Sequence, residues 1–321
     1  MSKSVAEILD LRHFSSHDLR ALLEQETRVW TESLFWDYRS SADMILRYID
    51  AKILPGYAIV DAGRVKGYCF FVYEGSKGVI GDLFVSAGEG NLTFSREERL
   101  LTHALATLQQ SPGVHRIEAQ LLLHRTGEVS EPFCRHSFRR YPRLFMVLPL
   151  APANASAEPA PPFTSEIELR RWSESDYQAA AAVITTSYRG HIDAEINDQY
   201  RTGSGSLRFL NNIVRFPGCG QFDNGSSFVA IHRTTRSMVG LVLCSRVKDD
   251  VGHVTQVCVV PGQRGRHIGE ALLAAASTEL RRRDFSRLTL TVTEANRGAV
   301  ELYKRLGYRV RHVFDAFVWE G

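Results

Sequence analysis

Long hydrophobic runs are missing from this sequence, and so is a leader segment. No stretch approaches the ~20 consecutive apolar residues that a helix needs to cross a bilayer. The first residues, Met1 to Glu7, lack the apolar core of a secretory signal. These absences argue against a membrane partner and predict a soluble, cytoplasmic protein.

Cysteine is scarce and shows no pairing pattern. The five cysteines are an odd number, and no two of them stand in a Cys-x-x-Cys arrangement. They are Cys69, Cys134, Cys219, Cys244 and Cys258. Neither a disulfide framework nor a zinc site is indicated, so we expect reduced thiols and no metal.

A strong charge of one sign is also lacking. Lys and Arg number 39 against 36 Asp and Glu, which gives a net charge of +3. Proteins that bind nucleic acid usually carry a concentrated basic face, so we expect no nucleic-acid partner. The dense cluster Arg281 to Arg283 falls where a helix should end, and cations suit the helix dipole there.

The most informative stretch runs from Val257 to Leu273. β-Branched residues stop at Pro261, a basic loop with glycines follows, and apolar residues then recur with helical spacing from Ile268. This pattern predicts a strand, a tight turn and a helix N-terminus. The first N–H groups of a helix lack intrahelical partners and attract anions, so a pyrophosphate is the expected ligand.

Two common nucleotide-binding loops do not fit this stretch. A P-loop needs Lys followed by Ser or Thr after its last glycine, whereas Gly269 is followed by Glu270 and Ala271. The spacing of Gly262, Gly265 and Gly269 does not match the Gly-x-Gly-x-x-Gly fingerprint of dinucleotide-binding domains.

The loop instead resembles motif A of the GNAT acetyltransferase superfamily, Gln/Arg-x-x-Gly-x-Gly/Ala. Arg264 and Gly269 match its two ends, while His267 stands at the central glycine. Downstream, Asn296 to Tyr308 resembles the family's Asn-x-x-Ala-x-x-x-Tyr helix with its Leu-Gly-aromatic ending. The resemblance implies acetyl-coenzyme A (acetyl-CoA) as the acetyl donor.

The length of 321 residues is enough for about two domains, and the two halves look alike. Leu83 falls opposite Val257, and Phe133 falls opposite Tyr303. We therefore predict an α/β (α+β) protein with two tandem GNAT folds, each a mixed, mostly antiparallel sheet flanked by helices. The expected divisions are a degenerate domain at 1–150, a Pro- and Ala-rich linker at 151–165, and an acetyltransferase domain at 166–321.

The resemblance assigns roles to residues of the second half. It implies that the backbone of Val257 and Val259 contacts the donor and that Tyr303 protonates the departing thiolate. Asn296 should cap the helix that bears Tyr303 and contact the pantetheine arm. The loop residues expected to hold the pyrophosphate are Arg264, Gly265, Arg266, His267, Ile268 and Gly269.

The base that takes the proton of the amine stays open between His253, Glu294 and a chain of waters. His253 starts the strand that enters motif A, where histone-type members of the family carry a glutamate, and Glu294 follows the next strand. Three acidic residues, Asp193, Glu195 and Asp198, fall in the segment that lines the acceptor site in this family. Their carboxylates would attract a cationic amine.

The sequence therefore predicts an acetyl-CoA-dependent N-acetyltransferase that moves an acetyl group to a primary amine by direct transfer in a ternary complex. The acceptor is a small-molecule amine or a peptide amine, and a homodimer is possible. One alternative is a non-catalytic acyl-CoA sensor or assembly protein. Another is a mycothiol-synthase-like enzyme, because that family also pairs two GNAT domains.

Overall fold

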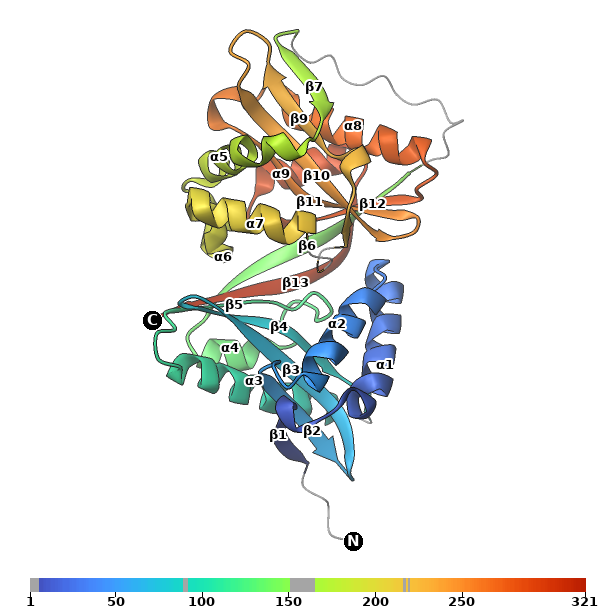
Figure 1. The fold of residues 1–321 in the computed structure, drawn as a ribbon, viewed down its shortest axis with the longest axis vertical. Coiled ribbons are helices and arrows are strands. Elements are labelled where there is room, and N and C mark those ends of the chain that lie inside the picture. Colours follow the sequence, from blue (N-terminus) through green and yellow to red (C-terminus); the bar gives the residue numbers. More distant parts are fainter. Residues whose placement is uncertain (1–5, 89–91, 151–164, 216–217, 219) are drawn as a thin grey trace. The chain divides into compact units, whose positions relative to one another are not determined.

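The chain folds into two compact units that exchange strands. A computed structural model describes residues 6–88, 92–150, 165–215, 218 and 220–321 (Figure 1). Unit 1 consists of residues 1–143 together with His312–Gly321, and unit 2 consists of Leu144–Arg311. Each unit thus contains a strand that the order of the sequence would assign to the other half.

Unit 1 is a sheet with helices on both faces. Its strands are β1 (Glu7–Asp10), β2 (Gly56–Asp61), β3 (Arg64–Glu74), β4 (Lys77–Val85), β5 (Arg116–Gln120) and, from His312 on, β13 (Arg309–Glu320), in that spatial order. Its helices are α1 (Ser16–Leu34), α2 (Arg39–Asp50), α3 (Leu92–Gln110) and α4 (Ser130–Arg135), with a 3-10 turn at Leu11–His13. A capping box between Ser15 and Asp18 starts α1.

Unit 2 repeats this layout. Its strands follow the spatial order β6 (Arg139–Pro149, from Leu144 on), β12 (Arg287–Thr293), β11 (Val251–Val259), β10 (Met238–Lys248), β9 (Phe228–His232) and β7 (Ile167–Arg171), and β8 (Gln221–Phe222) pairs with β10. Its helices are α5 (Tyr177–Tyr188), α6 (Ile192–Ile196), α7 (Gly203–Arg215), α8 (Ile268–Arg282) and α9 (Arg297–Arg305). Short 3-10 turns lie at Glu174–Asp176, Asp198–Arg201, Asn224–Ser226 and Pro261–Gln263.

The closing strands β6 and β13 are exchanged between the halves of the chain. Only one strand, β13, follows α9. In unit 2 the position beside β12 is filled by β6 from the first half of the chain, and β13 pairs with β5 in unit 1. The predicted linker, 151–165, falls almost entirely outside the described residues, so the predicted functional boundaries stay predictions.

The central strands of the two units carry matching irregularities. In unit 1, β3 and β4 shift register so that Gly81 is an extra residue before Asp82. In unit 2, β10 and β11 shift register so that Thr255 is an extra residue before Gln256. Such a bulge bends the strand locally, and in both units it lies where the strand leaves its parallel neighbour. Asp82 and Gln256 therefore occupy equivalent positions.

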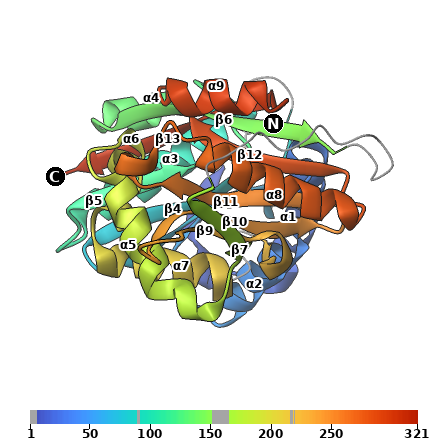
Figure 2. The same cartoon turned by 90° about the horizontal axis from the view of Figure 1, so that it is seen from above.

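Two layers of helix enclose the sheet of unit 2. Figure 2 shows α5 and α7 on one side of β9, β10 and β11, with α8 and α9 on the other. Leu241 and Leu243 of β10 pack with α5 and α7, whereas Gly240 and Gly252 face Leu272 and Leu280 of α8. We call the side that carries α5 and α7 the acceptor face, after the segment that lines the acceptor site by resemblance.

Candidate active site

Strands β11 and β12 separate in the middle of unit 2. Their parallel pairing covers Val251–Val254 and Arg287–Leu290. Beyond that point β11 continues in register with β10 only, with Val257 opposite Val242 and Val259 opposite Gly240. The edge of β11 that faces β12 is then available to a ligand's polar groups, and Val257 and Val259 lie on this part of the strand.

The loop after β11 presents backbone to the N-terminus of α8. Two residues of this loop, Gly265 (φ 75°) and His267 (φ 57°), adopt the left-handed conformation. α8 begins at Ile268 with His267 as its N-cap residue, and no side chain caps its first turn. The first N–H groups of α8 have no side-chain partner, which together with the helix dipole suits an anion.

His267 occupies the position of the central glycine without blocking the loop. Its backbone takes the left-handed conformation that glycine adopts most readily. Its side chain is 61% exposed, and its Nδ1 lies 3.0 Å from Oε2 of Glu270. The imidazole is therefore attached to the first turn of α8 and open to solvent.

The two loop arginines are engaged within the protein. Arg264 donates from Nη2 to the carbonyl of Ser187 at 2.7 Å and from Nε to the carbonyl of Val259 at 3.2 Å. Arg266 pairs with Glu166 and donates to Oε1 of Gln263 at 2.6 Å. Arg264 therefore ties the loop to the end of α5, a role that motif spacing does not reveal.

Helix α9 starts and is anchored as its sequence predicts. The Asn296 side chain accepts from the backbone N–H of Ala299, which caps the helix. Tyr303 is 7% exposed, and its ring lies 5.8 Å from that of Tyr308. Burial, reinforced by the charge of Asp193, raises the pKa of the Tyr303 phenol. The phenol therefore stays protonated at neutral pH and can donate a proton.

Asp193 makes a contact with β12 that the sequence did not predict. Thr293, the last residue of β12, donates a hydrogen bond to Oδ1 of Asp193. The segment predicted as a polar loop holds a helical turn here, and Nδ1 of His191 lies 3.4 Å from Oδ2 of Asp193. Asp193 acts electrostatically on the phenols of both Tyr188 and Tyr303. The charge of Asp193 thus acts on the predicted acid.

The other predicted acidic residues are not drawn into this cluster. Glu195 is 46% exposed and lies 3.6 Å from Arg201. Asp198 is half-buried in a 3-10 turn, and Glu294 is exposed directly after β12. Of the three predicted acceptor-site carboxylates, Asp193 is the one whose charge raises the pKa of Tyr303.

His253 is buried on the acceptor face and has an orienting partner. Its Nδ1 lies 2.9 Å from the hydroxyl of Thr289, and its ring lies nearly parallel to that of Phe145, with centroids 6.1 Å apart. Thr289 donates its own proton to the carbonyl of Gly252 at 3.1 Å. The Thr289 oxygen therefore accepts from Nδ1–H, which puts the lone pair of the neutral ring on Nε2.

Cys258 is the one cysteine on the separated part of β11. Burial raises the pKa of its thiol to about 12, so the thiolate that a nucleophile requires is absent at neutral pH. The described cysteines, Cys69, Cys134, Cys244 and Cys258, are all free. The protonated Cys258 thiol is a weak nucleophile.

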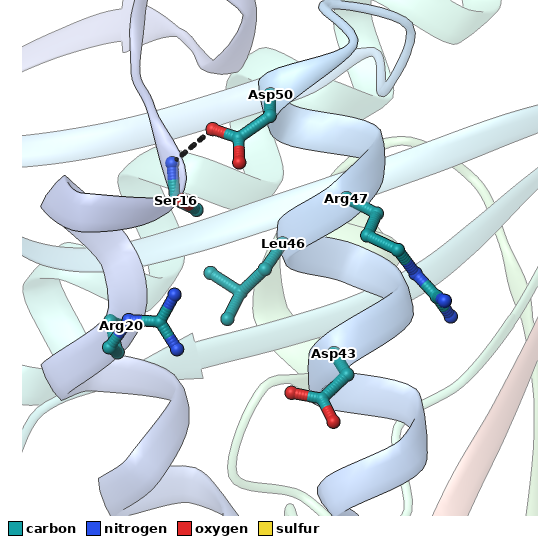
Figure 3. A pocket seen from close by; sticks show the side chains of 6 residues that line it. All are labelled: Ser16, Arg20, Asp43, Leu46, Arg47 and Asp50. Carbon is teal, nitrogen blue, oxygen red and sulfur yellow. Dashed lines mark hydrogen bonds between the residues drawn. The ribbon is translucent and has the colours of Figure 1, made fainter.

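Figure 3 shows a shallow pocket in unit 1, between α1 and α2. It is lined by Ser16, Arg20, Asp43, Leu46, Arg47 and Asp50. Asp50 accepts from the backbone N–H of Ser16 at 2.7 Å, which satisfies a free donor at the start of α1. The arrangement is that of two helices joined by surface charges.

Within the ranges described, no helix is long and apolar enough to cross a membrane, and no three potential ligands gather around a metal position.

Comparison with known proteins points to one family. The model of the "Acetyltransferase (GNAT) family" matches residues 186–308. Mycothiol acetyltransferase of Thermobispora bispora is 43% identical over 157 residues, which is 47% of this chain and 49% of that protein. An uncharacterized N-acetyltransferase of Methanocaldococcus jannaschii is 37% identical over 86 residues, which is 25% of this chain and 38% of that protein. The chain thus matches less than half the length of these relatives.

Solved structures share the fold over almost the whole chain. A GCN5-related N-acetyltransferase from Sphaerobacter thermophilus aligns with a TM-score of 0.64 and 17% identity, covering 100% of this chain and 96% of that one. A tandem GNAT protein from the clavulanic acid biosynthesis pathway aligns with a TM-score of 0.60 and 14% identity, covering 98% of both chains. At these identities the likeness concerns the fold.

Proposed function

Because residues 186–308 belong to the acetyltransferase (GNAT) family, we propose that unit 2 transfers an acetyl group from acetyl-CoA to a primary amine. The transfer is direct, with donor and acceptor bound together. The observation that carries this proposal is the combination of separated strands and an anion-binding loop with Tyr303 held beside Asp193. The reaction needs these parts in one place.

The donor fits the residues that are present. The N–H groups around Gly265, His267 and Gly269 suit its pyrophosphate, and no atom outside the loop lies within 3.7 Å of a Cβ built on Gly269. Arg264, Arg266 and Ile268 hold the loop in shape, and Asn296 adds a polar group at the start of α9. Acetyl-CoA supplies the thioester carbonyl, which the exposed backbone of Val257 and Val259 would polarise.

The residues that would accept and donate protons lie on either side of the separated strands. His253, with its lone pair on Nε2, is the proposed base for the ammonium proton, and Glu294 or water is the alternative. Asp193 attracts the cationic amine to the acceptor face. Tyr303, kept protonated by burial, gives its proton to the departing thiolate.

Unit 1 is proposed to be a degenerate copy that binds no donor. Phe133 stands where unit 2 has Tyr303, and a phenylalanine cannot donate a proton. The counterpart of the anion-binding loop includes residues 89–91, which lie outside the described residues.

Calorimetry on the full chain tests the proposal. Cutting the chain at the linker would deprive each unit of a strand, so isolated halves are unsuitable. We expect one acetyl-CoA per chain, and Gly269→Asp should abolish binding because a carboxylate would meet the pyrophosphate. Two equal sites would contradict the degenerate copy, and no binding would contradict the proposed function.

A further inference from the structure

Gln256 presents a buried amide without a partner on the acceptor face. The residue is 4% exposed, and its Nε2 makes no hydrogen bond. Gln256 stands opposite Leu243 of β10, whose side chain packs with α5 and α7, and residues opposite each other in a sheet share a face. It also directly precedes Val257, whose backbone is proposed to polarise the thioester. The unused donor therefore lies next to the reacting groups.

In unit 1, the side chain at the equivalent position is hydrogen-bonded within the protein. Asp82, the equivalent residue, accepts from the Leu83 N–H at 2.8 Å, from the Tyr38 hydroxyl at 2.5 Å and from the Tyr68 hydroxyl at 3.1 Å. Tyr68 also donates to Glu26 at 2.6 Å. The protein's own side chains thus occupy the polar groups at this position in unit 1, whereas in unit 2 they leave a donor unused.

A second unpaired polar atom lies on the same face of unit 2. Ser245 is fully buried, and its hydroxyl has no hydrogen-bond partner. Ser245 stands opposite His253 in the β10–β11 register, on the face that Leu241 and Leu243 share. Buried polar groups in native proteins are normally paired, and an unpaired one often marks a place where a ligand or water completes the bonding. Both unpaired atoms, Nε2 of Gln256 and Oγ of Ser245, belong to uncharged groups.

We propose that the acceptor carries an oxygen close to its amine, and that the Gln256 amide binds this oxygen. Nε2 can only donate, so its partner must be a hydroxyl, carbonyl or carboxylate oxygen. Ser245 can bind the same group or a neighbouring one. The acceptor class is therefore an amino alcohol, amino acid or similar oxygen-bearing amine rather than an alkylamine or a polyamine. This inference rests on the proposed acetyl transfer and narrows its substrate.

Matched amines test this class on the full-length protein. Thiol release from acetyl-CoA is measured with 2-aminoethanol against propylamine, and with serine amide against 1,4-diaminobutane. We expect kcat/KM to be at least about tenfold higher for the oxygen-bearing member of each pair, because a site with a buried donor rejects a ligand that leaves it unpaired. Thiol release without this preference would overturn the inference alone, whereas no release with any amine would remove the proposed function as well.

A variant separates ligand binding from a structural role. Gln256→Met keeps the shape and removes the donor, and we expect the KM of oxygen-bearing amines to rise about tenfold or more while acetyl-CoA affinity is retained. The melting temperature should stay the same or rise, because no hydrogen bond within the protein is lost. Tyr308→Phe is the control, since it removes a buried, unpaired hydroxyl beside Cys244 and should not alter acceptor preference.

Two results would overturn the role of Gln256. A clear fall in the melting temperature of Gln256→Met would mean that the amide has a partner within the protein. Unchanged preference between the paired amines in this variant would mean that water satisfies the amide and that the acceptor does not touch it.

Discussion

Asp193 of α6 accepts a hydrogen bond from Thr293 of β12, 100 positions further along the chain. The charge of this carboxylate raises the pKa of the buried Tyr303 phenol. The hydrogen bond also joins α6 to the strand that precedes α9. The position of Asp193 is therefore fixed by the fold and does not depend on a freely moving loop.

Replacing Asp193 by Asn should weaken acceptor binding. The amide keeps the contact with Thr293 but loses the charge, so we expect the KM for a cationic amine to rise roughly tenfold or more, with acetyl-CoA affinity unchanged. Steady-state kinetics measures the change. Glu195→Gln is the control, because Glu195 is half exposed and its surface ion pair with Arg201 contributes little. Equal effects of both variants would show that Asp193 has no special position.

Tyr303→Phe should reduce turnover and leave the fold intact. The substitution keeps the buried ring and deletes the proton donor, and general acid catalysis typically contributes ~10²- to 10⁴-fold. Tyr308→Phe removes the neighbouring hydroxyl and should keep full turnover. Stopped-flow measurement of the transfer step compares the two variants. If they behave alike, Tyr303 serves in packing only.

His253 should act as the base that activates the amine. His253→Ala is expected to lower turnover and to remove the decline of the rate toward acidic pH, because the ring accepts a proton only when it is neutral. Thr289→Val should cause a smaller loss, since it releases Nδ1 from its orienting partner. The pH profile of kcat checks both variants. If Glu294→Gln removes the acidic limb instead, the base is Glu294.

The stability of unit 1 should fall as the pH rises. Burial and the neighbouring Asp82 raise the pKa of Glu26 well above its ordinary value of 4.5. At pH values between 4.5 and the raised pKa, Glu26 is protonated in the native state and ionised in the unfolded state. The free energy of unfolding therefore decreases by about 1.4 kcal/mol for each pH unit in this range. Denaturant titrations over this range measure the slope. Glu26→Gln should flatten it, and an unchanged slope would contradict the raised pKa of Glu26.

Local patterns predicted much of the fold, including the elements that surround the proposed donor site. The β-branched run that ends at Pro261, the helical spacing after Ile268 and the capping Asn296 each act over a few residues, and the structure has β11, α8 and α9 at these places. The opposing positions in the two halves likewise correspond to β4 and β11. Signals of this kind depend on backbone preference and side-chain period, which a sequence displays directly.

The features that escaped prediction depend on contacts between distant parts of the chain. The exchange of β6 and β13 follows from which edges are left open after folding, and no local pattern encodes it. Arg264 resembles a phosphate ligand by spacing, yet its guanidinium is held by the carbonyl of Ser187, 77 positions away. The partners of Asp193 and His253 are distant in the same way. A sequence can identify such residues as candidates, but it does not show which groups they contact.

Thiol release in the presence of an amine panel tests the central claim most directly. The full-length protein is incubated with acetyl-CoA and each amine, and the concentration of free thiol is followed over time. The mass of the amine product is then determined by mass spectrometry. The account predicts amine-dependent thiol release with one acetyl group added to the amine, and a large loss of both in Tyr303→Phe. Binding of acetyl-CoA without release of thiol for any amine would contradict it and indicate a protein that senses acyl-CoA without using it.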